Sequence, residues 1–526
     1  MRSTNMMPSV GWMLVICCVV TLVAQSSQES LQEYLAERRA VLQQESTERT
    51  GGSLKLNAKE LKVNEYLMTA KEKEYAAALN GSVFPPAEHF FKSKELIEKS
   101  KVFQLIQQLP KGAALHLHDI SITSVNWVIK EATYMKDLYY CTEAGGSLHF
   151  AFFSVPPTVK SSACTRLWQS VSLTREKQGA AVFDDWLFSK MSMWTDDPQK
   201  MYPNSTASWK KFESCLGAVF DLICDVRVFQ PYLWQAMTEF VQDNVQYMEI
   251  RGLLPPLKAL NGTELSRNYT MQQYATIFDK FASANPSNFS GAKYIFSSRR
   301  KSPKSDIKSD VGLALKLREA FPDHFAGYDL VGQEDKGYPL LYFIDDLLLP
   351  SQLNLSLPYF FHAGETDWEG TSVDENIIDA LLLNTSRIGH GYAITKHPVA
   401  MAMARSHEVA VEVNPISNQI LGLVADLRNH PAATLISQGF PAVISSDDPS
   451  TWNAGPLSYD FYEAFMGLAG EQANLATLKK LAQDSIRYSA MSNSEKQAAM
   501  LLWQKKWDSF LDGILSQIQH EDVRTW

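Results

Sequence analysis

The sequence predicts an α/β protein built as a (β/α)8 TIM-type barrel. From His116 onward, short apolar strands alternate with stretches long enough to hold a helix, and eight such units make one barrel. Each polar cluster of interest also falls at the C-terminal end of its strand, where such barrels place their active sites. A doubly wound open sheet is the alternative, but no Gly-rich phosphate-binding turn follows the first strand.

The N-terminus predicts secretion. Arg2 precedes an apolar run at residues 10–24, and the small residues Ala24 and Ser26 suit a signal peptidase. The run is too short to cross a bilayer comfortably, so we expect a cleaved signal peptide at residues 1–26, with an uncleaved anchor as the alternative. No other stretch approaches membrane length, which predicts a soluble extracellular protein without a membrane span after cleavage.

Residues 27–109 are expected to form a separate helical segment. Apolar residues recur at helical spacing at Leu31, Tyr34, Leu35, Val41 and Leu42, which predicts an amphipathic helix that Gly51-Gly52 ends. Two further helices are expected at 58–79 and 93–109, separated by Pro85-Pro86. The apolar stripe of the first helix either packs on its own domain or forms a subunit interface.

The catalytic barrel is expected to begin at residues 110–129, which contain its first strand. The expected strands are 114–118, 245–251, 292–297, 327–331, 359–362, 387–390, 409–414 and 442–446. Helices between them include 373–383 and 429–438. The first two strands lie much further apart than one crossover helix requires. Residues 130–184 are rich in aromatic, Ser and Thr residues, so we expect an inserted small domain at 130–188, with the rest of the barrel at 189–526.

Four cysteines remain after the signal peptide, and an even count in a secreted chain permits disulfides. We expect Cys141 to pair with Cys164, because both lie in a loop-rich segment with little core of its own. Cys215 and Cys224 lie in an apolar, helical run and fit buried thiols or a bridge equally well.

Secretion would also expose glycosylation acceptors. Asn-x-Ser/Thr sequences occur at Asn80, Asn204, Asn261, Asn268, Asn288, Asn354 and Asn384. The net charge of −9 disfavours nucleic acid as a partner, since a polyanion usually requires a basic face.

The strand ends carry the residues of a metal site. His116 and His118 at i and i+2 project from one face of a strand, so both rings can reach one ion. His362 and Asp447 follow later strands and complete a nitrogen and oxygen ligand set that suits catalytic zinc, with a position left for water. The barrel is therefore expected to be of the metal-dependent hydrolase kind.

Three further residues at these strand ends suit acid–base chemistry. Glu365 can donate a proton to a substrate, His390 can position the attacking water or shuttle its proton, and Asp448 can hold the hydroxide or a substrate nitrogen. Structural alternatives remain open for several of the site residues: His362 as a core histidine, His390 as a turn cap, and 447–449 as a helix start with Pro449 at its first position.

Eight motifs in the chain together resemble the adenosine deaminase family. They are HLHD (116–119), YMEIR (247–251), SSRR (297–300), GYDLVG (327–332), FFHAGE (360–365), RIGHG (387–391), NPISN (414–418) and SSDDP (445–449). The signal peptide, the N-terminal helices and the cysteine-bearing insertion make the chain most similar to the secreted branch, the adenosine deaminase-related growth factors or type 2 adenosine deaminases.

The resemblance implies hydrolytic deamination of adenosine and 2′-deoxyadenosine to inosine and 2′-deoxyinosine, with release of ammonia, by a growth-factor-like protein that lowers extracellular adenosine. It implies one Zn²⁺ per subunit, bound by His116, His118, His362 and Asp447. Glu365 matches the acid that protonates purine N1, while His390 and Asp448 match the pair around the attacking hydroxide. Asp119 matches a ribose contact and Gly332 a backbone contact to the purine, beside Asp448.

The resemblance further implies a homodimer through the N-terminal helices and binding of a cell-surface receptor or glycosaminoglycan through the insertion. One departure is Gln333, where the secreted branch has histidine; glutamine can still bond a ribose hydroxyl. Two other functions stay open: deamination of a different purine, and receptor binding by a protein whose catalysis is vestigial.

Overall fold

The centre of the molecule is a ring of eight parallel strands. The computed structural model describes residues 30–524, and the expected signal peptide lies outside them. The strands form two four-stranded sheets, β1-β5-β6-β7 and β11-β10-β9-β8. Their bounds are β1 Gly112–His118, β5 Val245–Gly252, β6 Gly291–Arg299, β7 Phe325–Val331, β8 His362–Ala363, β9 Arg387–His390, β10 Ala410–Val413 and β11 Ala442–Ile444.

Backbone hydrogen bonds join the two sheets at both seams. At one seam Asp447 N donates to His116 O at 3.1 Å, and His118 N donates to Asp447 O at 3.2 Å. At the other, Tyr328 N donates to Pro358 O and Phe360 N donates to Tyr328 O, both at 3.0 Å. These bonds close the ring, so the predicted (β/α)8 barrel is confirmed.

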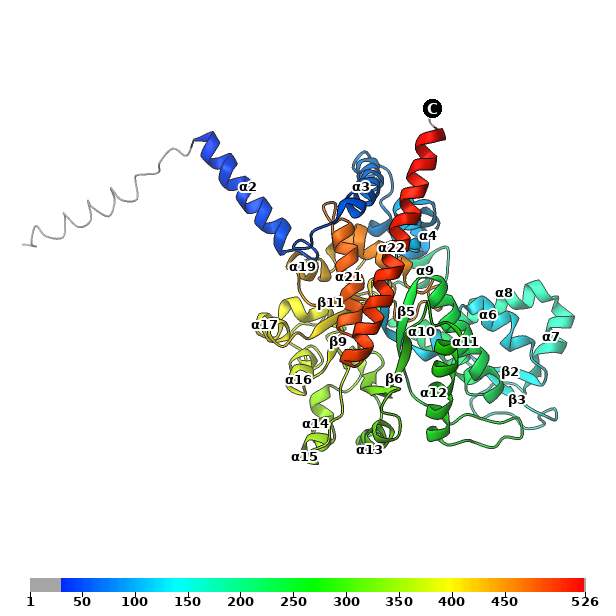
Figure 1. Ribbon diagram of the computed structural model, residues 1–526. Coiled ribbons are helices and arrows are strands. Elements are labelled where there is room, and N and C mark those ends of the chain that lie inside the picture. Colours follow the sequence, from blue (N-terminus) through cyan, green and yellow to red (C-terminus); the bar gives the residue numbers. More distant parts are fainter. Residues whose placement is uncertain (1–29, 525–526) are drawn as a thin grey trace, which may run out of the picture.

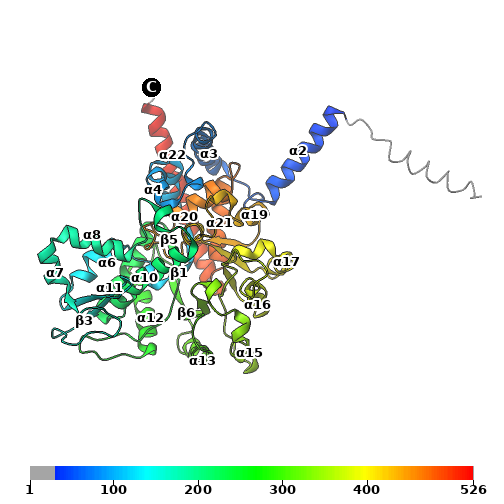
Figure 2. The same cartoon turned by 180° about the vertical axis from the view of Figure 1, so that it is seen from behind.

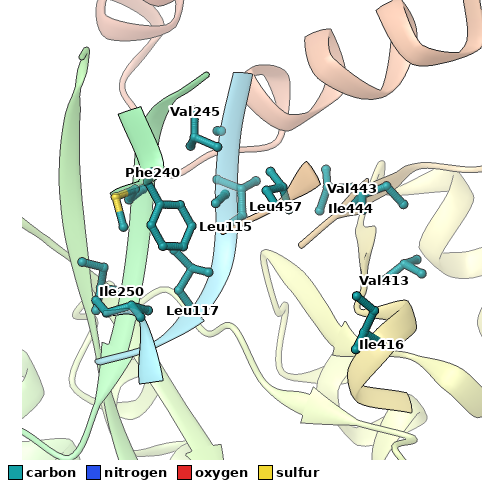
Figure 3. Close-up of a cluster of buried hydrophobic side chains, with 14 of the residues drawn as sticks. Leu115, Leu117, Phe240, Val245, Ile250, Val413, Ile416, Val443, Ile444 and Leu457 are labelled. Atoms are coloured by element: carbon teal, nitrogen blue, oxygen red, sulfur yellow. The ribbon is translucent and has the colours of Figure 1, made fainter. Parts of the chain in front are cut away.

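Alternation along β1 separates the core from the site. Leu115 and Leu117 are fully buried and lie beside Phe240 of α11 (Val226–Gln242), outside the ring (Figure 3). Side chains alternate across a strand, so His116 and His118 face the opposite way. One strand therefore supplies both packing and chemistry.

Helices surround the ring, as Figures 1 and 2 show. They include α12 (Arg267–Ala284), α13 (Lys304–Ala320), α16 (Asn376–Leu382), α17 (Pro398–Ser406), α19 (Ala432–Ser437) and α21 (Leu475–Arg487). The helices expected at 373–383 and 429–438 are present as α16 and α19 and are shorter than predicted.

The expected strand at 359–362 is reduced to His362–Ala363, because Tyr359 pairs only through isolated bridges. No helix within residues 30–524 is long and apolar enough to span a membrane.

The first N-terminal helix, α2 (Leu31–Glu48), begins with a capping box formed by Ser30 and Glu33 and buries no residue. It extends away from the body of the molecule (Figure 1). The alternative in which its apolar stripe packs on its own domain is therefore wrong for this chain. A subunit interface is the remaining alternative.

The next helix, α3 (Ala58–Leu79), behaves differently, because it buries Val63 and Leu67 in the main core and packs on α22 (Asn493–Arg524). The helix expected at 93–109 is two helices, α4 (Phe90–Lys99) and α5 (Lys101–Gln108). They are separated at Ser100, whose hydroxyl caps α5 by accepting from Phe103 N at 3.1 Å.

The stretch predicted as an insertion contains a small antiparallel sheet, ordered β3-β2-β4, and two helices. Its elements are β2 Leu138–Thr142, β3 Leu148–Phe152, β4 Gln169–Ser170, α7 Val171–Gln178 and α8 Ala180–Met191. Cys141 and Cys164 are bridged, which confirms that prediction. Cys215 and Cys224, within and after α10 (Ser205–Ile223), are buried free thiols. The seven acceptor asparagines are all exposed.

Candidate active site

The structure brings together the four residues predicted to bind metal. His116 and His118 come from β1, His362 from β8, and Asp447 from the turn after β11; their ligand atoms all lie within 4.8 Å of one another. Asp447 Oδ1 lies 3.3 Å from His116 Nε2 and 3.1 Å from His118 Nε2. These are the nitrogen and oxygen donors that zinc accepts.

Two buried atoms of this cluster indicate that a cation fits there. His116 Nε2 and Asp447 Oδ1 lack any hydrogen-bond partner among the described residues. Buried polar atoms without partners are costly, and a metal ion would satisfy both at once.

Carboxylates hold two of the ligand rings from behind. His116 Nδ1 lies 2.6 Å from Glu412 Oε2, and His362 Nδ1 lies 2.7 Å from Asp329 Oδ2. A carboxylate accepts the Nδ1 proton of a neutral imidazole, which leaves the Nε2 lone pair free for a metal. This pairing is typical of metal-binding histidines.

Two buried arginines neutralise these carboxylates. Arg251 donates to Asp329 at 3.0 Å and to Glu412 at 2.9 Å, and Arg387 donates to Glu412 at 2.7 Å. Burial raises the pKa of Glu412, but the charges of Arg251 and Arg387 outweigh burial and hold that pKa well below its ordinary value. Glu412 is therefore ionised, as its role at His116 requires.

Glu365 is positioned by the carboxylate of Glu334. Glu334 accepts hydrogen bonds from Glu365 N at 2.6 Å and from Gly364 N at 3.0 Å. Burial raises the pKa of Glu365 well above its ordinary value, and the negative charges of Asp447 and Glu334 raise it further. The raised pKa favours the protonated form of the Glu365 carboxyl group, which can donate a proton.

His390 and Asp447 both adopt left-handed backbone conformations, with φ of 59° and 58°. Such values are uncommon outside glycine and concentrate at functional sites. Burial lowers the pKa of His390 well below its ordinary value, so this ring is neutral. Asp448, next to the ligand Asp447, is buried with Oδ1 unpaired within the described chain. Asp447 pairs with Leu117 through an isolated β-bridge and Pro449 begins a turn, so the helix-start alternative is wrong.

A cavity of about 700 Å³ opens above the metal cluster, and the predicted substrate residues line it. Asp119 accepts hydrogen bonds from Tyr274 at 2.8 Å and Tyr294 at 3.4 Å. Burial raises the pKa of Asp119 to about 7, although the two tyrosine hydroxyls lower it. Gly332 has φ of 100° with open space where a Cβ would lie, so its backbone faces the cavity unobstructed.

The insertion and α10 form the outer wall of the same cavity. Glu143 and His149 from the β2–β3 hairpin line it together with Trp209 and Asp221 of α10. His149 joins the two parts, with Nε2 2.7 Å from Glu143 and Nδ1 2.9 Å from Asp221. The inserted segment is thus part of the pocket.

Several supporting residues were not assigned a role from the sequence. Glu412 lies in the apolar strand β10 and Asp329 in β7, and a charged residue within a buried strand was the available signal. Arg251 and Arg387 lie within the family motifs, but the sequence does not show which carboxylates they bind. Nor does it show that Asn418 bonds His390.

The chain is similar to known proteins over most of its length. The chain matches two family models, described as Adenosine/AMP deaminase N-terminal over residues 12–106 and Adenosine deaminase over residues 193–502. It is 44% identical over 505 residues to adenosine deaminase 2 from Sus scrofa, covering 95% of this chain and 98% of the relative. It is 40% identical to an adenosine deaminase from Phlebotomus duboscqi, covering 96% and 98% of the two chains.

Solved structures share the fold at lower identity. The N6-methyl-AMP deaminase from Arabidopsis thaliana matches with a TM-score of 0.53 at 17% identity, over 77% of this chain and 98% of that one. The adenine deaminase from Arthrobacter aurescens matches with a TM-score of 0.51 at 18% identity, over 75% and 98%.

Proposed function

Since the chain belongs to the adenosine deaminase family, we propose that it is a secreted, Zn²⁺-dependent enzyme that deaminates adenosine and 2′-deoxyadenosine. Water is added at C6 of the purine and the amino group leaves as ammonia, giving inosine or 2′-deoxyinosine. The observation that carries the proposal is the cluster of His116, His118, His362 and Asp447, with two unpaired buried ligand atoms, beside Glu365, whose pKa is raised by burial.

The residues of the site divide the reaction between them. Zn²⁺ bound by the four ligands would lower the pKa of a water molecule towards neutrality and so supply the nucleophile. Glu365 gives its proton to purine N1, which draws electrons away from C6. His390 and Asp448 hold the attacking oxygen on the other side. Asp119 accepts a hydrogen bond from a ribose hydroxyl, and the Gly332 backbone contacts the purine.

The direct test is loss of adenosine absorbance with the purified protein, with and without a zinc chelator. Adenine, guanosine and AMP assayed in parallel would identify a different purine substrate. Glu365→Gln keeps the shape of the side chain but removes its acidic proton, so kcat should fall by about 100-fold or more. Glu369→Gln on the same loop is exposed and should leave kcat unchanged.

Near-normal turnover by Glu365→Gln would contradict the acid assignment. A wild-type protein that lacks stoichiometric zinc and leaves adenosine intact would contradict the enzyme proposal. It would favour the alternative in which the chain acts by binding a receptor.

Secretion and glycosylation form the second part of the proposal. The bridge between Cys141 and Cys164 is favoured in an oxidising compartment, and the seven exposed acceptor asparagines are accessible to sugar transfer. The test is the intact mass of protein collected from culture medium, measured before and after glycan removal. It reports on secretion, on glycosylation and on cleavage after residue 26. Protein retained in cells without glycans would contradict it.

The partners complete the proposal. The exposed stripe of α2 supports a homodimer formed through the N-terminal helices. The insertion, with its own sheet, supports binding of a cell-surface receptor or glycosaminoglycan, through which the protein would act as a growth factor. Retention on immobilised heparin, compared with a variant lacking 130–188, tests the glycosaminoglycan; equal retention would contradict it.

A further inference from the structure

A buried chain of hydrogen bonds leads from a backbone amide to the ring of His390. Ala432 N donates to His430 Nδ1 at 3.0 Å. His430 Nε2 lies 2.9 Å from Asn418 Oδ1, and Asn418 Nδ2 lies 3.0 Å from His390 Nδ1. Asn418 and His430 are 0% and 2% exposed, so water does not compete for these bonds.

Only one assignment of protons satisfies this chain. The Ala432 amide can only donate, so His430 Nδ1 must be unprotonated. Burial lowers the pKa of His430 to about 3, and the neutral ring therefore carries its proton on Nε2. That proton is donated to Asn418 Oδ1, which leaves the amide group of Asn418 facing His390. His390 Nδ1 must then accept, and the proton of this neutral ring must lie on Nε2.

We propose that Asn418 and His430 are positioning residues that hold His390 as its neutral Nε2–H tautomer. This inference rests on the proposed function and assigns a role within it. In this tautomer His390 donates a hydrogen bond to the attacking oxygen and cannot take a proton from it. Removal of a proton from the attacking water therefore falls to a group other than His390.

The neighbouring ligand histidines have the opposite arrangement. Carboxylates accept from Nδ1 of His116 and His362, which leaves their Nε2 lone pairs free for a metal. An amide N–H donates to Nδ1 of His390, which places a proton on its Nε2. His390 is therefore excluded from the ligand set, although its ring centre lies only 4.9 Å from that of His116.

Other groups near His390 do not change this assignment. Glu365 Oε1 lies 3.6 Å from Nδ1, further than the Asn418 amide. On the other side, Asp447 Oδ2 lies 3.7 Å from Nε2 and is already bonded by Ser417.

Neutron diffraction of deuterated holoenzyme tests the tautomer without any assay. We expect deuterium on Nε2 of His390, on Nε2 of His430 and on the Asn418 nitrogen that faces His390. Deuterium on Nδ1 of His390 would overturn the proposal. A wild-type protein inert towards adenosine would overturn the proposed function alone, because the deuterium positions would still decide the tautomer.

Kinetics of isosteric variants test the consequence. Asn418→Asp presents only acceptors to His390 and so forces the proton onto Nδ1. We expect kcat for adenosine to fall by about 100-fold, with KM, zinc content and Tm close to wild type, because nucleoside binding does not use this bond. The matched control is Asn64→Asp, in which the same exchange on α3 keeps the oxygen that accepts from Leu475 N.

His430 lies one hydrogen bond further from His390 than Asn418 does, so its variants should have smaller effects on kcat. His430→Gln keeps a donor near the position of Nε2, so kcat should stay within about threefold of wild type, whereas His430→Phe removes that donor and should lower kcat about tenfold. Unchanged kcat in Asn418→Asp would overturn the proposal. A loss of activity that follows loss of zinc or of Tm would also overturn it, because the role would then be structural.

Discussion

The centre of the barrel and helix α2 both leave groups unsatisfied, but the groups are of opposite kinds. At the barrel centre the unsatisfied groups are polar, His116 Nε2 and Asp447 Oδ1. On α2 they are apolar: Leu35 is 41% exposed and Val41 53%. Unpaired polar atoms of this kind suit a cation, and exposed apolar side chains suit a protein surface, which is the basis of the proposed metal site and dimer.

The surroundings of these two regions also differ. The ligand rings are held by carboxylates and arginines, so the metal site exists before the metal binds. Helix α2 is specified by its capping box and its own backbone bonds, without tertiary packing. The ligand side chains at the barrel centre are therefore fixed in place, whereas no part of the described chain covers the apolar stripe of α2. Four predictions test this contrast.

The largest effect is expected at Glu412. Glu412→Gln removes the anion between Arg251, Arg387 and His116 and leaves buried positive charge without compensation. The free energy of unfolding should fall by about 3–5 kcal/mol, measured by urea denaturation. Glu319→Gln, exposed on α13, is the control. A loss as small as that of the control would mean that this network does not stabilise the barrel.

Removal of the metal should have a similar or slightly smaller effect. Zinc at 100 to 1,000 times its Kd stabilises a folded protein by about 3–4 kcal/mol. A chelator should therefore lower Tm in scanning calorimetry, and by the same amount in a protein that lacks residues 30–48. An equal Tm with and without chelator would argue against a metal site in the barrel.

A smaller effect is expected behind the ligand His362. Asp329→Asn removes the carboxylate that accepts from Nδ1 of this ring. Zinc affinity should drop by about 10- to 100-fold, measured by competition with a chelating dye. Asp323→Asn, exposed in the turn before β7, should leave the affinity unchanged. Full affinity in Asp329→Asn would show that the carboxylate does not orient the ring.

The smallest effect on stability is expected on α2. Leu35→Glu combined with Val41→Glu should change the free energy of unfolding by no more than about 0.5 kcal/mol, since both side chains are exposed. The same variant should sediment as a monomer, while zinc content stays unchanged. Gln32→Glu with Gln43→Glu adds the same charge to the opposite face and should remain a dimer. Dimers in both variants would place the interface elsewhere.

Much of the barrel could be predicted from the sequence because alternating strands and helices leave a local pattern. The expected strands at 387–390 and 327–331 fall on β9 and within β7. The metal cluster could be predicted because its residues lie at or just after the C-terminal ends of strands, which meet at one end of a barrel. The pairing of Cys141 with Cys164 followed from the small core of their segment.

The supporting contacts could not be predicted, because they depend on three-dimensional neighbours. Glu412 lies far from His116 and Arg251 in sequence, and no local pattern states which charges meet inside a ring. The chain of hydrogen bonds from Ala432 to His390 likewise connects α19 with α18 (Pro415–Ile420). For α2, amphipathic spacing predicts an apolar face but does not state what covers it.

The place of the inserted hairpin has a consequence for regulation. Glu143 and His149 line the cavity that also contains Glu365, so the segment expected to bind a partner and the segment expected to bind the nucleoside share one wall. If a partner that grips the hairpin changes the affinity for the nucleoside by some factor, thermodynamic linkage requires the nucleoside to change the affinity for that partner by the same factor. The affinity of the insertion for its partner would then depend on the extracellular nucleoside concentration.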